Sequence, residues 1–166
     1  MQQQCYNILQ FPADTGGCGH YRMKFPAWSL STVRKDLRFN DLMKLVVDPN
    51  FFRDFRIVRL QRQVNDAQCE YFLKFLAPLS KSIGFWLIYE IDDVIGYEDI
   101  PKYNHAREAF KNEKFFNNVK NMLEAADFIT VTTEAAVPAV SAVISSGFVI
   151  NASSKLIPPN VSKVPR

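Results

Sequence analysis

The sequence FWLIYEIDD, residues 85–93, decides the fold of this chain. Its first five residues are all apolar, and Glu90, Asp92 and Asp93 follow them. A short apolar run rich in aromatic and branched residues predicts a strand in the middle of a sheet, buried on both faces. The carboxyl ends of such strands open into the ligand crevice of α/β proteins, so the three acids are candidate functional residues. The alternative is that they cap the next segment or pair with nearby arginines.

A second candidate site is the run GGCGHYR, residues 16–22, which follows the first predicted strand. Glycines let the backbone turn sharply, and free amides at the start of a helix favour a phosphate. Gly17, Gly19 and Arg22 are therefore candidate phosphate contacts, and His20 is a candidate ligand contact or base. The spacing matches neither the Rossmann fingerprint nor a P-loop, and a plain tight turn is the alternative.

Strands and helices alternate along the rest of the chain. We predict strands at residues 6–11, 43–47, 56–63, 85–93, 128–132 and 155–161, and helices at 23–30, 64–83, 115–126 and 133–144. Pro26 should disturb the start of the first helix, and Gly84 is a plausible cap for the end of the second. This alternation predicts an α/β fold with a Rossmann-like parallel sheet and right-handed crossovers.

Length and composition set broad limits. A chain of 166 residues suits one domain, or one half of a two-domain enzyme. The net charge of +3 is uneven, because the first half carries the surplus of Lys and Arg. That surplus suits a phosphate-bearing ligand or nucleic acid, although a solvated basic surface explains dispersed cations as well. No stretch is apolar and long enough to span a bilayer, and three scattered cysteines indicate a reducing cytoplasm.

Several motifs in this order resemble the N-terminal half of a GT-B glycosyltransferase, of the group-1 type found in phages and bacteria. The motifs that carry the resemblance are GGCGHYR (16–22), LQR (60–62), YEIDD (89–93), IP (100–101), ADFITVTT (126–133) and LIPPNV (156–161). The set spans nearly the whole chain. Each motif is weak alone, and it is their order and spacing that make the set specific.

The resemblance implies transfer of a sugar from a nucleoside diphosphate sugar to an acceptor, without a bound metal or other cofactor. Gly17 and Gly19 would approach the donor phosphates with help from Arg22. The base would be Asp92, Asp93 or His20, and Glu90 would orient it. Paired carboxylates also suit a divalent cation, which ranks lower because no third oxygen-rich motif stands out.

The same resemblance implies a domain boundary. Residues 1–157 would form the Rossmann-like acceptor-side domain, and 158–166 would be a hinge towards a second domain or chain. The hinge motif here lacks the family's usual glycine after Asn160. We therefore expect a fragment of a longer enzyme, a separate second chain, or a half that is inactive alone.

The sequence is compatible with three functions. The first is the acceptor-side domain of a sugar transferase. The second is a non-catalytic binding, assembly or inhibitor module that reuses the half-fold. The third is a nucleic-acid-facing role with modified phage DNA as the acceptor, which predicts salt-sensitive DNA binding.

Overall fold

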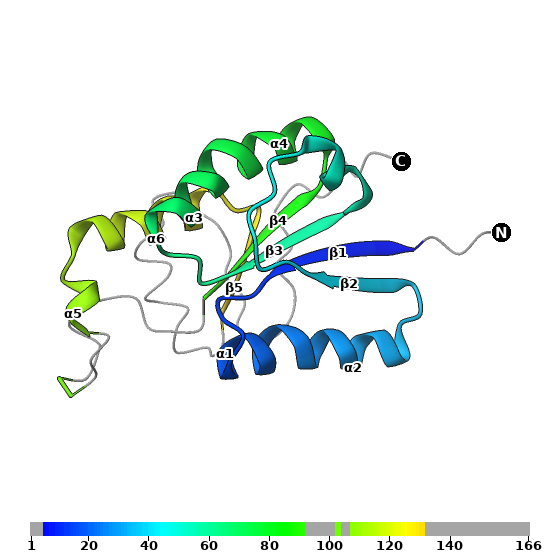
Figure 1. Ribbon diagram of the computed structural model, residues 1–166, viewed down its shortest axis with the longest axis horizontal. Helices are drawn as coiled ribbons and strands as arrows, with labels where there is room; N and C mark the ends of the chain where they lie inside the picture. The colour runs from blue at the N-terminus through cyan, green and yellow to red at the C-terminus, as the bar shows by residue number, and fades with distance from the viewer. Residues whose placement is uncertain (1–4, 92–101, 104–106, 132–166) are drawn as a thin grey trace.

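The computed structural model describes residues 5–91, 102–103 and 107–131 of the chain. Within them, a five-stranded sheet has the order β2-β1-β3-β4-β5, and every pair of neighbouring strands is parallel (Figure 1). The strands are β1 (Tyr6–Phe11), β2 (Leu37–Asp41), β3 (Ile57–Gln61), β4 (Trp86–Ile91) and β5 (Phe128–Val131). With the flanking helices the sheet forms an α/β, Rossmann-like fold, which confirms the predicted class.

Helices cover both faces of the sheet (Figure 1). One face carries a continuous helical segment made of α1 (Gly17–Gly19), the π-helical turn η1 (His20–Lys24) and α2 (Phe25–Val33). The other face carries α3 (Asp66–Tyr71), the π-helical turn η3 (Phe72–Leu76), α4 (Ala77–Ile83) and α6 (Glu113–Ala125). A 3₁₀ helix, η2 (Pro49–Asp54), and a short helix, α5 (Arg107–Phe110), complete the described elements.

The strand order reverses between β1 and β3. The chain leaves β1 on one side to form β2 and returns on the other side to form β3. Open α/β sheets bind ligands outside the carboxyl ends of the strands at such a reversal. This edge of the sheet is therefore where a functional site is expected.

Both long helical segments contain a π-helical turn just before a proline. At the end of η1 the amide of Phe25 donates to the carbonyl of His20, and Pro26 follows. The end of η3 repeats the pattern at Ala77, before Pro78. Proline has no amide hydrogen and crowds the carbonyl four residues back, and a widened turn relieves this conflict. The predicted disturbance at Pro26 is confirmed, and the helix continues through it.

The hydrophobic core lies between the sheet and the layer of α3, α4 and α6. Side chains alternate between the two faces along each strand. Leu9 and Phe11 of β1 and Leu87 and Tyr89 of β4 belong to this core and are almost completely buried. Phe52 of η2 belongs to the same core and is also fully buried.

The opposite face of the sheet becomes polar towards the carboxyl ends of the strands. The register places Gln61, Glu90 and Thr130 side by side, with Gln10 and Arg59 paired two residues earlier. Gln10, Gln61 and Glu90 have no exposed surface. Buried polar side chains require partners, and theirs are at the candidate functional site.

The second strand lies earlier than predicted. Strand β2 spans Leu37–Asp41, whereas the predicted strand at 43–47 is outside the sheet. Met43 and Val47 are 55% and 71% exposed, so their apolar character does not reflect burial in a sheet. The prediction is wrong because an edge strand needs few apolar residues, and LRFND supplies only Leu37 and Phe39.

Strand β4 has the predicted mid-sheet position but is not buried on both faces along its whole length. Leu87 and Tyr89 on the core side are completely buried. On the other side Trp86 is 42% exposed, Ile88 is half-buried and Glu90 is fully buried. Burial on that face therefore increases towards the carboxyl end of the strand.

Most other predicted elements are confirmed where the structure describes them. Strands β3 and β5 and helix α6 lie at the predicted places. Gly84 caps α4 in the left-handed region, with φ of 90°. The predicted helix at 133–144, the strand at 155–161 and the hinge at 158–166 lie outside the described residues.

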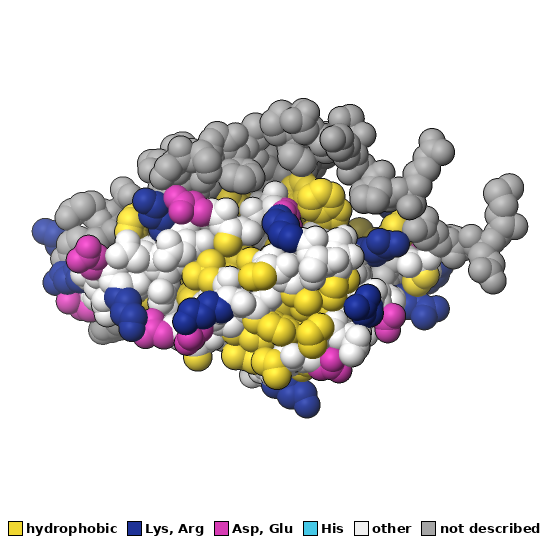
Figure 2. All heavy atoms as spheres, turned by 90° about the horizontal axis from the view of Figure 1, so that it is seen from above, with side chains coloured by type: hydrophobic (Ala, Val, Ile, Leu, Met, Phe, Trp, Pro, Cys, Tyr) yellow, Lys and Arg dark blue, Asp and Glu magenta, His cyan; other side chains and the backbone are white. Residues whose placement is uncertain are grey.

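Exposed hydrophobic side chains form groups on the surface of the molecule. Seen from the side of α4, hydrophobic side chains occupy the middle of the surface, with charged side chains around them (Figure 2). Large exposed hydrophobics follow β2 at Met43, Leu45 and Val47, and others lie on the α1–η1–α2 segment at Tyr21, Phe25, Trp28, Leu30 and Val33. Groups of this kind mark contact surfaces more often than isolated ones do. No helix in the described part of the chain has the length and apolar character needed to cross a membrane.

Candidate functional site

Two arginines from different elements hold the carboxylate of Glu90. The Nε of Arg22 donates to Glu90 Oε1 at 2.6 Å, and the Nη2 of Arg59 donates to Glu90 Oε2. Arg22 belongs to η1, just after the glycine-rich turn, while Arg59 lies on β3 and Glu90 on β4. The structure therefore brings the glycine-rich turn and the acidic end of β4 together at one edge of the sheet.

The acid and the two cations differ in how far they are buried. The Glu90 side chain has no exposed surface, whereas the side chains of Arg22 and Arg59 are 29% and 22% exposed. A carboxylate without water is costly unless cations and hydrogen bonds replace its hydration. Two positive charges thus surround one negative charge, and only the positive ones reach solvent. Such a group can bind an anion, while both oxygens of the acid are already engaged.

The chain turns sharply where β3 ends, beside this cluster. Arg62 has a positive φ of 40°, which is uncommon for a residue other than glycine. Its amide donates to the carbonyl of Glu90 at 2.8 Å, which extends the contact between β3 and β4 past the last residue of the strand. Unusual backbone conformations of this kind concentrate at functional sites.

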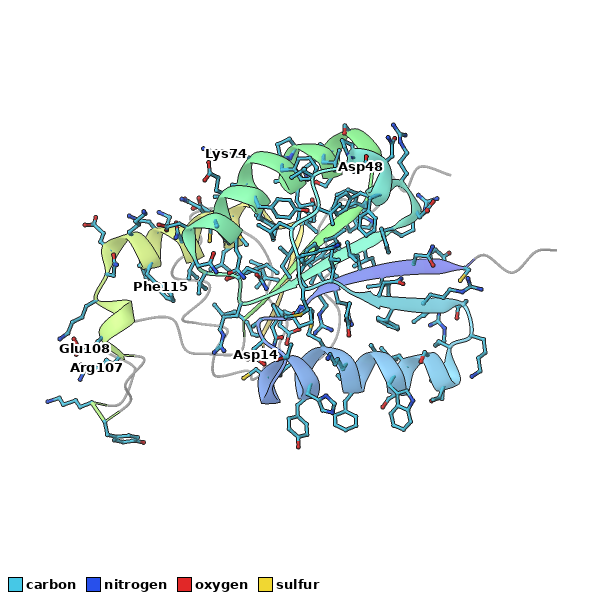
Figure 3. All side chains as sticks on the ribbon, in the orientation of Figure 1. Asp14, Asp48, Lys74, Arg107, Glu108 and Phe115 are labelled. Carbon is cyan, nitrogen blue, oxygen red and sulfur yellow. The ribbon has the colours of Figure 1, made fainter. Side chains whose placement is uncertain are left out.

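Asp14 closes the start of the helical segment that follows β1 (Figure 3). Its Oδ1 accepts hydrogen bonds from the amides of Gly16 at 2.8 Å and Gly19 at 3.2 Å. A carboxylate here satisfies first-turn amides and is stabilised by the positive end of the helix dipole. The Gly19 amide, which the sequence suggested as a phosphate contact, is therefore engaged with the chain's own acid. No hydrogen bond from the Gly17 amide is found among the described residues.

The two candidate glycines have different surroundings. A Cβ atom on Gly19 would lie 2.0 Å from the carbonyl oxygen of Asp14 and 3.2 Å from the Cβ of Pro12. A Cβ on Gly17 would meet nothing within 4 Å. Only glycine fits at position 19, because the helix approaches the preceding turn too closely for a side chain. Position 17 faces open space at the start of the helix.

Two buried glutamines tie the glycine-rich turn to the end of β3. The Oε1 of Gln61 accepts from the amide of Ala13 at 3.1 Å, and its Nε2 donates to the carbonyl of Cys18 at 3.1 Å. The Nε2 of Gln63 donates to the carbonyls of Phe11 and Pro12, each at 3.2 Å. These hydrogen bonds between neutral groups hold the turn against the residues at the end of β3.

A third buried glutamine extends the polar row towards β2. The Nε2 of Gln10 donates to Asp41 Oδ1 at 3.0 Å, and no described residue donates to its Oε1. Gln10 is in register with Arg59, so it lies on the strand next to one of the two arginines that hold Glu90. Buried acceptors in native structures nearly always have a donor, commonly a bound water molecule or a ligand group.

The structure does not join His20 to this cluster. His20 is exposed, and its ring packs edge-on against Phe25 and Tyr21, with centroid distances of 4.5 and 5.9 Å. No ion pair or hydrogen bond links it to Glu90 among the described residues. The other two candidate bases, Asp92 and Asp93, lie outside the residues that the structure describes.

Cys69 lies beneath the glutamines and is not a reactive group. It is 2% exposed, and its thiol is 3.7 Å from the carbonyl oxygen of Gln63. Burial, followed by the charge of Asp66, raises the pKa of the Cys69 thiol to about 11. The thiolate form is therefore scarce near neutral pH, which excludes Cys69 as a nucleophile. Within the described residues no three His, Cys, Asp or Glu side chains are arranged to hold a metal ion.

The sequence singled out Arg22 and Glu90 but not the residues that position them. Arg59, Gln10, Gln61 and Gln63 were not among the candidates. One signal points to three of them: polar side chains alternate with buried apolar ones in β1 and β3, which marks one polar face. The polar face alone does not mark a site. It does so only together with the buried Glu90, which β4 supplies to the same edge of the sheet.

Comparisons with known proteins add little. No protein-family model matches the chain, and no curated protein matches it. Among solved structures, the chain is similar to the crystal structure of a pilus assembly-related protein from Burkholderia pseudomallei. The two share 12% sequence identity with a TM-score of 0.49, over 88% of this chain and 96% of that one. A likeness this distant carries no argument about what the chain does.

Proposed function

We propose that this chain binds the diphosphate of a nucleotide sugar at the carboxyl edge of its sheet and serves as the acceptor-side half of a glycosyltransferase. The observation that carries the proposal is the convergence of Arg22 and Arg59 on the buried carboxylate of Glu90. It rests also on the GT-B resemblance of the sequence motifs.

The position of the cluster supports an anionic ligand. It lies at the carboxyl ends of parallel strands, beside the reversal of strand order between β1 and β3. Glu90 aligns both guanidinium groups without shielding their outer sides from solvent. Because Arg presents a rigid fork of donors, two aligned arginines suit the paired oxygens of a diphosphate.

The start of the helical segment supports the same ligand. Position 17 is open, and the positive end of the helix dipole lies there. Asp14 now occupies the amides of Gly16 and Gly19. A diphosphate would approach from the Gly17 side and be held mainly by the arginines, with Asp14 keeping the turn in place.

The transfer step needs a base on the acceptor. The bond between the sugar and the diphosphate breaks, a new bond forms to an acceptor oxygen, and the proton of that oxygen passes to a base. Asp92 and Asp93 directly follow β4, so we assign them this role ahead of His20, whose ring is engaged by Phe25 and Tyr21. The arginines stabilise the charge that develops on the leaving diphosphate.

The first experiment is calorimetric titration of the protein with nucleoside diphosphate sugars, the free nucleoside diphosphates and inorganic diphosphate. Arg22→Gln should weaken binding about tenfold or more, since a hydrogen bond to a charged group contributes roughly 1.5–3 kcal/mol. Arg53→Gln is the matched control, because Arg53 is an exposed arginine that donates to Asn50 and lies in η2. Absence of binding by every ligand, or equal binding by the two variants, would contradict the proposal.

A second candidate function is binding without transfer. One observation favours it: Glu90, which the resemblance has orienting the base, has both oxygens engaged by arginines. The two functions are distinguished by measuring the release of nucleoside diphosphate from the donor sugar, with water or an added acceptor. Tight binding with no release, in a protein that loses binding on Arg22→Gln, would assign the chain to a binding module. Release that depends on Arg22 would support the transferase.

A further inference from the structure

Strand β2 presents an open edge to solvent. The amide of Tyr6 donates to the carbonyl of Asp36, and the amide of Leu42 donates to the carbonyl of Gln10. Peptide groups alternate in direction along a strand, so residues 36, 38, 40 and 42 face β1. The main-chain groups of Leu37, Phe39 and Asp41 therefore point away from the sheet, and within the described residues no strand pairs with them.

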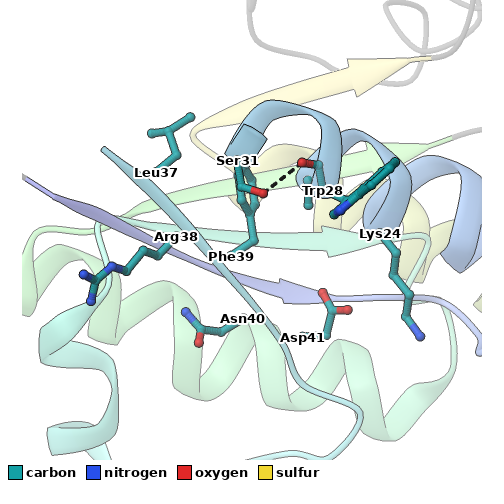
Figure 4. Close-up of a pocket in the computed structure, with 9 residues that line it drawn as sticks. Lys24, Trp28, Ser31, Leu37, Arg38, Phe39, Asn40 and Asp41 are labelled. Atoms are coloured by element: carbon teal, nitrogen blue, oxygen red, sulfur yellow. Dashed lines mark hydrogen bonds between the residues drawn. The ribbon is translucent and has the colours of Figure 1, made fainter. Parts of the chain in front are cut away.

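A groove runs along this edge. It has a volume of about 630 Å³ and lies between β2 and α2, with Lys24, Trp28 and Ser31 on the helix side (Figure 4). Trp28 is 65% exposed, which is unusual for so large an apolar side chain. The hydroxyl of Ser31 donates to the carbonyl of Trp28 at 2.8 Å, so the polar group on this wall is satisfied within the helix.

The groove has an aromatic side chain on each wall and charged side chains beside them. Trp28 lies between Lys24 and Ser31 along the helix, and Phe39 is the middle residue of β2. Arg38 and Asp41 are the charged residues of the strand. Stable protein interfaces have this arrangement, with aromatic anchors surrounded by a polar rim.

The edge is complementary to itself. An antiparallel pairing of two β2 strands about a two-fold axis at Phe39 lets each Phe39 exchange two main-chain hydrogen bonds with Phe39 of the second copy. The same register places Leu37 opposite Asp41 and Arg38 opposite Asn40. No like charges face each other, and the two Phe39 side chains meet on the groove side of the sheet.

Strand β2 is only five residues long and carries the charged residues Arg38 and Asp41, yet its outward main-chain groups have no strand partner among the described residues. It contains no proline, and the carboxylate of Asp41, which lies on the groove side with Phe39, accepts a hydrogen bond from the side-chain amide of Gln10. Unpaired main-chain groups on an edge strand are a template for pairing with another strand. An isologous contact closes on itself, so it stops at a dimer.

We propose that β2 and α2 form the interface of a homodimer, in which the two β2 strands pair antiparallel and join the sheets of both copies. Trp28 of each copy packs in the groove against Phe39 of the second copy. This interface is separate from the Glu90 cluster and does not depend on the function proposed above.

The test is sedimentation velocity over a roughly hundredfold range of protein concentration, combined with hydrogen exchange. The wild-type protein should sediment with twice the 19.1 kDa mass of one chain at the upper concentrations. Trp28→Glu should shift it to a monomer, because two carboxylates would be buried at the centre of the contact. The amides of Phe39 and Asp41 should exchange more slowly in the wild type than in Trp28→Glu.

Tyr21→Glu is the matched control. Tyr21 is an aromatic residue of the same helical segment, 71% exposed, and it does not line the groove. This variant should remain dimeric. A second pair, Phe39→Pro and Phe39→Ala, removes the same side chain, but only proline also removes the outward amide, so proline should weaken the dimer further.

Each other outcome overturns the proposal. A wild-type protein that stays monomeric at every concentration would show that the edge serves no second copy. A dimer that persists in Trp28→Glu with unprotected Phe39 and Asp41 amides would lie on another surface. Equal loss of the dimer in Tyr21→Glu would move the interface to the outer side of the helical segment.

Discussion

The Nε of Arg22 lies 2.6 Å from Oε1 of Glu90, although 68 residues separate the two in sequence. This contact joins the helical segment after β1 to the end of β4. It is the physical link between the two stretches that the sequence marked as functional. Arg59 completes it from β3, so three separate elements meet at one buried carboxylate.

Glu90→Gln should destabilise the fold by about 1–3 kcal/mol, because a buried charged partner of two cations is lost. The amide keeps the size of the carboxylate but cannot satisfy both arginines. Urea denaturation monitored by circular dichroism gives the free energy of unfolding. Glu70→Gln removes an exposed acid paired with Lys74 and should change stability by less than about 0.5 kcal/mol. Equal effects of the two substitutions would contradict this account of Glu90.

Gly19→Ala should lower stability by at least about 2 kcal/mol, because the new methyl group overlaps the Asp14 carbonyl. Gly17→Ala is the control and should be neutral or slightly stabilising, since alanine is the better helix former and the space is open. Thermal unfolding of the two variants measures the difference. If Gly19→Ala were as stable as the wild type, the helix would have to be able to move away from the turn.

Cys69 should resist thiol reagents in the folded protein. Its pKa is raised to about 11 by burial, whereas Cys5 is exposed and Cys18 is half-buried. Titration with an aromatic disulfide near pH 8 should label Cys5 first and Cys69 only after unfolding. Substitution of Cys5 and Cys18 by serine isolates the Cys69 signal. Rapid labelling of that variant without denaturant would show that the core opens locally.

Asp66 should make stability depend on pH in the acid range. Hydrogen bonds from Lys114 and Asn118 hold the pKa of Asp66 below its usual value. The unfolded chain therefore takes up this proton first, and the stabilisation present above the unfolded pKa is lost as pH falls through the folded one. Denaturant midpoints measured between neutral pH and pH ~3 should fall less steeply in Asp66→Asn. If the denaturant midpoint of Asp66→Asn fell with pH as steeply as that of the wild type, the contact between α3 and α6 would not contribute to the pH dependence of stability.

Asp92→Asn should abolish sugar transfer while leaving donor binding within about twofold, because a base acts only on the acceptor proton. Release of nucleoside diphosphate measures transfer, and calorimetry measures binding. Asp93→Asn is the companion variant that tells which of the two acids is the base. Full transfer by both variants would remove the acidic run after β4 from the mechanism and leave His20 as the candidate.

The sheet was predictable where strands are strongly apolar. Strands β1, β3, β4 and β5 each carry several apolar residues, because one face of each packs against the helical layer of the core. Strand β2 was not predictable in this way. It lies at the edge, buries only part of Leu37 and Phe39, and becomes a strand through its hydrogen bonds to β1. Non-local pairing of this kind leaves little trace in local sequence.

The candidate site was also predictable only in part. Glycine and acidic residues at strand ends are visible in the sequence, and they drew attention to Gly19, Arg22 and Glu90. The partner Arg59 and the glutamines at positions 61 and 63 resemble ordinary surface residues in the sequence. Their role depends on the register between β3 and its neighbours, which periodicity alone cannot supply.

The position of Glu90 has a consequence for the order in which the chain folds. Arg22 and Arg59 are synthesised long before β4, and each can stay hydrated until that strand docks. Glu90 can lose its water only when both cations are already in place, since a lone buried carboxylate is too costly. Docking of β4 is therefore expected after β1 and β3 have formed their part of this edge, and substitutions at Glu90 should accelerate unfolding more than they slow folding.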